Sequence, residues 1–217
     1  MSLLSSKTVN LTDSMRCLKH LFTKIRDSKT ERAEFTTYAS RLMRVICEEG
    51  LAYIQPTAKT VNTPTNNTYD GIDIDQKSIV AVSIIRAGDS MLDSFMAVAP
   101  EAAVGKILIQ RDEETAKPIL FYSKLPSLIG KNIALLDPML ATGGSANAAI
   151  KVLIEKGADE NRIVFFNVVS CPEGIKSIHS EYPNVTIVTG EVDDGLNEKN
   201  YIVPGLGDFG DRFYGTI

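Results

Sequence analysis

The chain of 217 residues lacks features that mark several whole classes of protein. It has no Trp, only 3 Cys and 2 His, and no basic excess, because 23 Lys and Arg stand against 27 Asp and Glu. The net charge of −4 argues against a nucleic-acid partner, since such binding relies on a basic patch that neutralises phosphates. A hydrophobic content of 44% is that of an ordinary globular protein and excludes a disordered chain.

Cysteine usage and apolar runs exclude further classes. Cys17, Cys47 and Cys171 are odd in number and form neither a C-x-x-C pair nor a disulfide framework, so we expect reduced, buried thiols. The apolar run Ile79–Ile85 falls far short of the roughly 18–20 residues of a membrane span. Residues 1–7 lack the basic start, apolar middle and cleavage site of a secretory signal. We therefore expect a cytoplasmic protein with no membrane partner.

The distribution of apolar residues predicts one α/β domain over residues 1–217, with an N-terminal helical part at about 12–50. Apolar residues recur at helical spacing from Leu18 to Ile25 and from Phe35 to Ile46, and the turn formers of residues 63–71 predict a loop or the tip of a hairpin. After that point, continuous apolar runs alternate with helical stretches, which indicates a parallel sheet covered on both faces. Ligands of such sheets bind at the carboxyl ends of the strands. The expected strands are 79–85, 106–110, 119–122, 133–136, 163–169 and 185–188, and the expected helices are about 89–99, 145–156 and 172–181.

The segment from Ile133 to Ile150 is the most informative part of the sequence. A buried strand ends in Asp137, a short loop follows, and Thr142-Gly143-Gly144-Ser145 opens an Ala-rich helix. Paired glycines let the backbone approach a ligand, and free N–H groups at a helix start attract an anion. A Gly-rich turn that only caps a helix has the same pattern, but the carboxylate of Asp137 is placed to accept hydrogen bonds from the hydroxyls of a ribose phosphate. The nucleoside-triphosphate and dinucleotide loop motifs are absent.

Residues Asp137 to Ser145 resemble the phosphoribosyl-diphosphate motif of type I phosphoribosyltransferases. A single acid followed by Pro138 matches the uracil phosphoribosyltransferase branch, and the resemblance extends from about Ser78 to the C-terminus. It implies the type I fold, a mostly parallel sheet flanked by helices, with N-terminal helices and a small C-terminal base-binding hood. It also implies transfer of the phosphoribosyl group from 5-phosphoribosyl 1-diphosphate (PRPP) to N1 of uracil, giving UMP and diphosphate, with Mg²⁺.

Two arginines acquire a role through this resemblance. Arg86 follows the strand Ile79–Ile85, where a lone Arg is usually a solvated cap, and the resemblance makes it a diphosphate ligand in a loop that often holds a cis peptide bond. Arg111 lies in the mixed-charge segment 109–118, which by itself reads as a solvent-facing hairpin. The resemblance makes Arg111 a second diphosphate ligand on a loop that closes over the site and excludes water.

The C-terminal segment 201–215 is the second strong signature. Gly205, Gly207 and Gly210 together with Pro204 indicate a fixed, irregular backbone, although a Gly-rich tail at a sheet edge has the same composition. The resemblance makes it the uracil-binding segment and assigns Asp208 to the sugar diphosphate and its Mg²⁺. The implied catalytic residues are Arg86, Arg111, Asp137 and Asp208; the PRPP-binding residues are Arg86, Arg111, Asp137, Pro138, Met139, Leu140, Ala141, Thr142, Gly143, Gly144, Ser145 and Asp208; the uracil-binding residues are Met139, Ala141, Ile202, Gly207, Asp208 and Phe209.

Three alternatives compete with a uracil transferase. A nucleotide-sensing RNA-binding regulator on the same fold needs a basic face, which the charge balance disfavours. A purine or orotate transferase is disfavoured by Asp137-Pro138 and by residues 207–209, and an inactive interaction protein is disfavoured by the intact phosphate loop. His20 and His179 lie outside every motif, where packing or surface roles are expected. The resemblance further implies a homodimer or homotetramer and GTP as an activator in some members.

Overall fold

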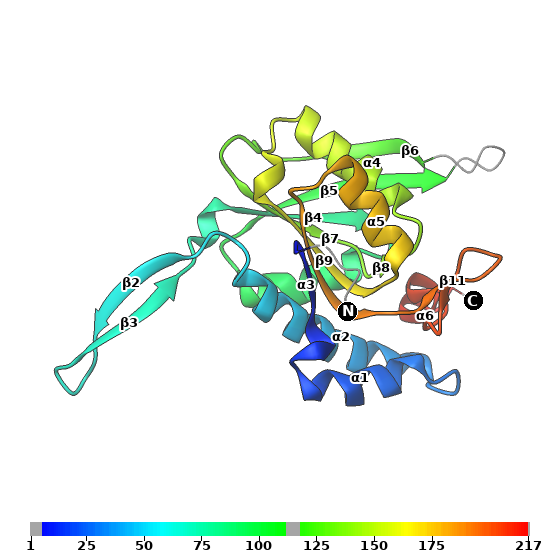
Figure 1. Ribbon diagram of the computed structural model, residues 1–217, viewed down its shortest axis with the longest axis horizontal. Helices are drawn as coiled ribbons and strands as arrows, with labels where there is room; N and C mark the ends of the chain where they lie inside the picture. The colour runs from blue at the N-terminus through cyan, green and yellow to red at the C-terminus, as the bar shows by residue number, and fades with distance from the viewer. Residues whose placement is uncertain (1–5, 112–117, 217) are drawn as a thin grey trace.

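A single mixed sheet organises the computed structural model, which describes residues 6–111 and 118–216 (Figure 1). The strand order is β1-β10-β9-β7-β4-β5-β6, and β8 pairs with β9. All of these pairs are parallel except that of β5 with β6. The strands are β1 (Thr8–Asn10), β4 (Ile79–Ile85), β5 (Ala103–Arg111), β6 (Pro118–Lys124), β7 (Asn132–Leu136), β8 (Met139–Leu140), β9 (Ile163–Ser170) and β10 (Thr186–Val192).

Helices cover both faces of this sheet and bury two apolar layers (Figure 1). In β4, Ile79 and Ala81 point into the layer under α1, α2 and α3, whereas Val80, Val82 and Ile84 point into the layer under α4 and α5. Each buried Val, Leu or Ile stabilises the fold by about 1.5–3 kcal/mol, so central strands must be apolar on both faces. The helices are α1 (Arg16–Arg26), α2 (Arg32–Leu51), α3 (Asp89–Val98), α4 (Gly144–Glu155), α5 (Pro172–Glu181) and α6 (Phe209–Tyr214).

Smaller elements complete the chain. The β2–β3 hairpin projects away from the sheet in Figure 1, and almost all of its residues are exposed, including Tyr69 at 62% and Ile72 at 63%. The antiparallel pair of β11 and β12 precedes α6 near the C-terminus. The elements are β2 (Thr57–Asn62), β3 (Thr68–Asp73), β11 (Gly195–Leu196) and β12 (Ile202–Val203), with 3-10 turns at Leu11–Asp13, Gln76–Ser78 and Glu160–Arg162.

The structure confirms the six predicted strands as β4, β5, β6, β7, β9 and β10, and the three predicted helices as α3, α4 and α5. It corrects the prediction for Cys17, which is exposed because it lies outside the buried apolar stripe of α1 and lines an open cavity, while Cys47 and Cys171 are buried. Among the described residues, no helix combines the length and the apolar character needed to cross a membrane. The carboxyl ends of β4 and β7 lead into Arg86 and Asp137, so the topology brings two predicted site segments to one edge of the sheet.

Candidate active site

The predicted phosphate loop lies between β7 and α4. Gly143 adopts φ +83 at the N-cap of α4, and a side chain there would collide with Ser177, because its Cβ would stand 2.9 Å from the Cβ of Ser177. The left-handed conformation favours glycine, which explains the residue at this turn. The first N–H groups of α4 have no partner within the helix and carry its positive dipole end. They turn the loop into a cradle for an anion.

Strand β9 and the turn after it fix this loop from behind. The carbonyl of Pro138 accepts hydrogen bonds from the N–H groups of Val168 and Val169 at 3.1 and 3.0 Å. Asn167 Nδ2 donates to the carbonyl oxygen of Asp137 at 3.1 Å, and Cys171 Sγ donates to that of Ala141 at 3.1 Å. These bonds join the loop to a fully buried strand, so the anion cradle is preformed rather than assembled around a ligand.

The pKa of Asp137 is strongly shifted from its ordinary value. Burial raises the pKa of Asp137 to about 7, and the negative charge of Asp208 acts in the same direction. The N–H of Met139 donates to Oδ1 at 3.4 Å and opposes the shift. Asp137 and Asp208 are therefore close enough to interact, and a ligand that donates hydrogen bonds to Asp137 favours its ionised form.

The C-terminal segment forms the opposite wall. Gly205 and Gly207 have φ values of +65 and +84, so the chain bends sharply before α6. The Val203–Pro204 peptide bond is cis. Asp208 caps α6, because its Oδ1 accepts the N–H of Asp211 at 2.8 Å. The ring of Phe209 is 1% exposed and packs edge-on against Phe35 at 5.3 Å, which fastens the segment to α2.

Between these walls lies a cavity of about 370 Å³, within the range of small-ligand sites. It gathers most of the residues that the sequence predicted for a ligand. The exceptions are Pro138, which is buried behind the loop, Arg86, which is not among the lining residues, and Arg111, whose side chain is not described. Two lining residues, Lys199 and Asn200, belong to no motif that the sequence revealed, and Tyr201 lies in the C-terminal signature without an assigned role. The predicted residues that line the cavity are Asp137, Met139, Leu140, Ala141, Thr142, Gly143, Gly144, Ser145, Ile202, Gly207, Asp208 and Phe209.

Arg86 begins the loop after β4, and its peptide bond with Ile85 is cis. Gly88 lets this loop pass against the sheet, since a Cβ there would stand 2.3 Å from the carbonyl oxygen of Leu136. The guanidinium of Arg86 turns toward α6, where it bonds Asp211. Arg111, the second predicted diphosphate ligand, is the last residue of β5. Its side chain lies outside the part of the molecule that the structure describes.

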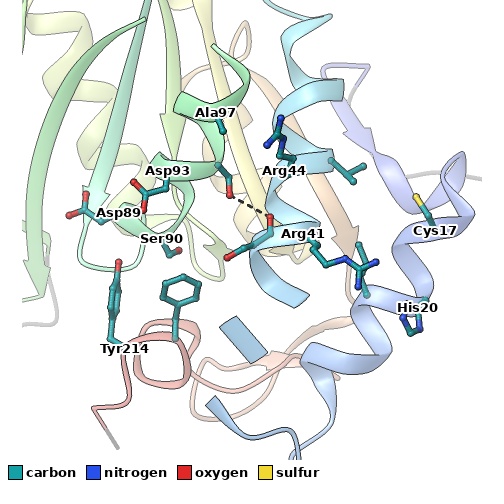
Figure 2. A pocket seen from close by; sticks show the side chains of 14 residues that line it. Cys17, His20, Arg41, Arg44, Asp89, Ser90, Asp93, Ala97 and Tyr214 are labelled. Atoms are coloured by element: carbon teal, nitrogen blue, oxygen red, sulfur yellow. Dashed lines mark hydrogen bonds between the residues drawn. The ribbon is translucent and has the colours of Figure 1, made fainter. Parts of the chain in front are cut away.

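A second, larger cavity of about 770 Å³ lies beside α6, between α1, α2 and α3. Figure 2 shows Arg41 and Arg44 on α2 and Asp89, Ser90 and Asp93 on α3, with Tyr214 below them. No sequence motif marks this cavity, because its lining residues come from four helices at irregular spacing.

Comparison with solved structures defines the class of the fold. The chain matches the structure of the AQ2163 protein from Aquifex aeolicus with a TM-score of 0.82, 36% identity and coverage of 95% and 97% of the two chains. A purine phosphoribosyltransferase from Pyrococcus horikoshii matches with a TM-score of 0.51 at 14% identity, over 73% of this chain and 85% of that one. The architecture is the type I phosphoribosyltransferase fold.

Sequence relatives narrow the class to one family. The family model described as uracil phosphoribosyltransferase matches residues 12–216. Uracil phosphoribosyltransferase 1 of Schizosaccharomyces pombe is 50% identical over 200 residues, which cover 92% of this chain and 91% of that protein. The chain belongs to the uracil phosphoribosyltransferase family.

Proposed function

We propose that this chain transfers the phosphoribosyl group from PRPP to N1 of uracil and releases UMP and diphosphate. The observation that carries the proposal is one cavity bounded by an anion cradle, the carboxyl group of Asp137 and a rigid C-terminal backbone. The 5-phosphate of PRPP binds the N–H groups at the start of α4, and Asp137 accepts hydrogen bonds from the ribose hydroxyls. The likeness to family members over nearly the whole chain supports the same reaction.

Uracil binds between the phosphate loop and residues 202–209. Backbone N–H and C=O groups at Gly207 and Ile202 have fixed positions there, because Gly205 between them is hydrogen-bonded to both Arg26 and Asp193. Uracil presents a carbonyl at position 4 and an N–H at position 3, whereas cytosine reverses both. A fixed backbone pair therefore accepts uracil and leaves polar groups unpaired against cytosine.

The reaction builds positive charge on the ribose ring and negative charge on the leaving diphosphate. Catalysis then depends on positioning and electrostatics rather than on a nucleophilic side chain. Arg86 and Arg111 bind the diphosphate in this proposal. His20 packs edge-on against Tyr38, and His179 Nε2 pairs with the carbonyl of Val185 at 3.1 Å, so we assign neither histidine as a base. The leaving diphosphate accepts the N1 proton of uracil.

Mg²⁺ fits the acidic groups of the cavity. Among the described residues, no group of three or more His, Cys, Asp or Glu side chains forms a metal cage. Asp137 and Asp208 nevertheless interact across the site, and Mg²⁺ is commonly held by one or two carboxylates together with substrate phosphates. Asp208 would hold the ion, mostly through the substrate diphosphate and water, and the ion would neutralise charge on the leaving group.

We further propose a cytoplasmic homodimer or homotetramer. The exposed apolar residues Val61, Tyr69 and Ile72 on the β2–β3 hairpin support an oligomer, since an isolated two-stranded hairpin is marginally stable in water.

We also propose that GTP activates the protein. Sedimentation of the purified protein with and without GTP, combined with rate measurements, tests both proposals.

The decisive experiment incubates the purified protein with radiolabelled uracil, PRPP and Mg²⁺ and measures labelled UMP. Formation of UMP with uracil and none with cytosine is the expected result. Absence of UMP from the uracil reaction overturns the proposed function, while comparable turnover of cytosine overturns only the backbone recognition of the base. RNA at physiological salt serves as a third arm, because tight binding there would favour the regulator that the charge of −4 argues against.

A further inference from the structure

Both terminal nitrogens of the Arg86 guanidinium donate hydrogen bonds to the C-terminal segment. Its Nη2 donates to Oδ1 of Asp211 at 2.6 Å, and its Nη1 donates to the hydroxyl of Thr216 at 2.8 Å. That hydroxyl donates in turn to the same oxygen of Asp211 at 2.6 Å. The bonds from Thr216 and Arg86 keep the pKa of Asp211 below its usual value, so Asp211 is ionised at neutral pH.

The backbone of Arg86 is held by the same segment. The hydroxyl of Tyr214 donates to the carbonyl oxygen of Arg86 at 3.4 Å, and the guanidinium lies 6.0 Å from the centre of the Tyr214 ring. Figure 2 shows the Tyr214 side chain pointing toward Asp89 and Ser90, which follow Arg86 at the start of α3. Because the side chain of Arg86 is half exposed, these hydrogen bonds rather than burial fix the rotamer of Arg86 and the position of its guanidinium.

The geometry also ties Arg86 to the cavity. A Cβ atom on Gly210 would stand 3.4 Å from Nη2 of Arg86 and 3.4 Å from Oδ1 of Asp208. The guanidinium therefore lies at the rim of the cavity, next to the carboxylate that caps α6. The N-cap and first turn of α6 thus carry Asp208, which lines the cavity, and Asp211, which is not part of the lining and binds the Arg86 cation.

We propose that Asp211 is a positioning residue of the transferase reaction, which holds the guanidinium of Arg86 where the diphosphate of PRPP arrives. Asp211 touches no reacting atom and acts only through Arg86. Thr216 supports the same position of the guanidinium, because its hydroxyl bonds both Arg86 and Asp211. This inference rests on the proposed function. It links the base-binding segment to the diphosphate ligand, because both depend on the placement of α6.

Simple electrostatics and positioning predict opposite effects for the loss of the Asp211 charge. A carboxylate beside an anion site repels the anion, so Asp211→Asn should tighten diphosphate binding if charge alone matters. If Asp211 positions Arg86, the freed side chain samples other rotamers and diphosphate binding weakens. Asp93→Asn is the matched control, since Asp93 is an exposed acid on α3 near Tyr214 and, within the part of the chain that the structure describes, forms no ion pair with Arg86.

The experiment compares wild type, Asp211→Asn, Asp211→Glu, Thr216→Val and Asp93→Asn in the uracil assay. For Asp211→Asn we expect the KM for PRPP to rise about 5- to 20-fold while the KM for uracil changes less than about twofold. Calorimetric titration with inorganic diphosphate and Mg²⁺ should show a parallel weakening. Thr216→Val should give a smaller rise, Asp211→Glu a partial rescue, and Asp93→Asn no rise.

An Asp211→Asn protein with the wild-type KM for PRPP, or with a lower one, overturns the inference. A fall in kcat with unchanged KM and unchanged diphosphate binding does so as well. If Asp211→Asn does not fold, the Thr216→Val and Asp211→Glu proteins decide by the same two measurements. The wild-type assay separates this inference from the proposed function, because a wild-type protein that makes no UMP overturns the function itself.

Discussion

Arg26 and Asp193 face each other through two hydrogen bonds, from Nη1 to Oδ2 at 2.9 Å and from Nη2 to Oδ1 at 2.6 Å. Nη1 of Arg26 also donates to the carbonyl of Gly205 at 2.7 Å, and the N–H of Gly205 donates to Asp193 at 2.8 Å. Asp193 is almost fully buried, with a side chain 3% exposed. The pair therefore joins the end of α1 to the segment that carries Gly207 and Asp208.

Replacing Arg26 should destabilise the protein strongly. Arg26→Met leaves the buried carboxylate of Asp193 without its partner, and loss of one member of a buried pair costs about 3–5 kcal/mol. Urea unfolding followed by circular dichroism measures the change. The double variant Arg26→Met/Asp193→Asn should regain part of the loss, because no unpaired charge remains at the buried position 193, and Glu191, the second acid that pairs with Arg26, is partly exposed to water. Losses that simply add in the double variant would show that the two residues act independently.

The raised pKa of Asp137 predicts how stability depends on pH in the absence of substrate. Its folded pKa of about 7 lies above the ordinary value of 3.8, so the folded state binds a proton that the unfolded state has released. The contribution is fully present below about pH 4 and is lost as the pH rises to about 7. Asp137→Asn should therefore be more stable than wild type at pH 7–8, with little difference near pH 4. Thermal unfolding across this range measures the effect.

Glu155→Gln is the control for this series, because Glu155 is an exposed acid at the end of α4 and should show no such pH-dependent gain. The same Asp137→Asn change should lower kcat/KM for PRPP, since an amide cannot replace the carboxylate that we propose accepts hydrogen bonds from the ribose hydroxyls. Equal pH profiles for wild type and Asp137→Asn would show that Asp137 titrates normally.

Gly88→Ala should prevent stable folding of the Arg86 loop. The new methyl group would stand 2.3 Å from the carbonyl oxygen of Leu136 and 2.6 Å from that of Ile84, and neither backbone atom can move freely within the sheet. We expect a loss of at least about 2 kcal/mol, measured by urea unfolding. Gly130→Ala, at a glycine with φ +69 and open space around it, should cost only about 1 kcal/mol. Similar losses at both positions would contradict the close packing of Gly88.

Arg111→Ala should impair turnover much more than folding. Removing one charge-assisted bond to phosphate costs about 1.5–3 kcal/mol, which corresponds to roughly a 10- to 150-fold loss in kcat/KM. The melting temperature should stay within about 2 °C of wild type, because Arg111 stands at the last residue of β5. Unchanged steady-state kinetics would remove Arg111 from the proposed reaction.

The sequence predicted the central strands and the strand–turn–helix geometry of the Asp137–Ser145 segment well, because each depends on neighbours in the chain. Buried parallel strands such as β4 show as continuous apolar runs, and the Thr142–Ser145 turn carries its own glycines and hydroxyls. Strand β1 was missed because three residues are too short to show a pattern, and α6 because six residues hold less than two turns.

Other features were beyond sequence reasoning because they join distant residues. The pairing of Arg86 with Asp211 spans 125 positions, and no local pattern marks it. Lys199 and Asn200 line the cavity only because they lie in the turn between β11 and β12, beside the predicted phosphate loop. The exposure of Cys17 follows from the rotation of α1 about its axis, which its neighbours on α2 determine.

The pairing of β1 with β10 has a consequence for how the molecule folds. Thr8 pairs with Ile187, so one edge of the sheet closes only after nearly the whole chain is available. Contacts between residues so far apart in sequence must overcome a large loss of chain entropy before they stabilise anything, and they form late. During synthesis α1 and α2 therefore form before the strands that they pack against, and one edge of β10 keeps its backbone groups unpaired until β1 binds to it. Conditions that slow this step should expose β10 to pairing with other chains.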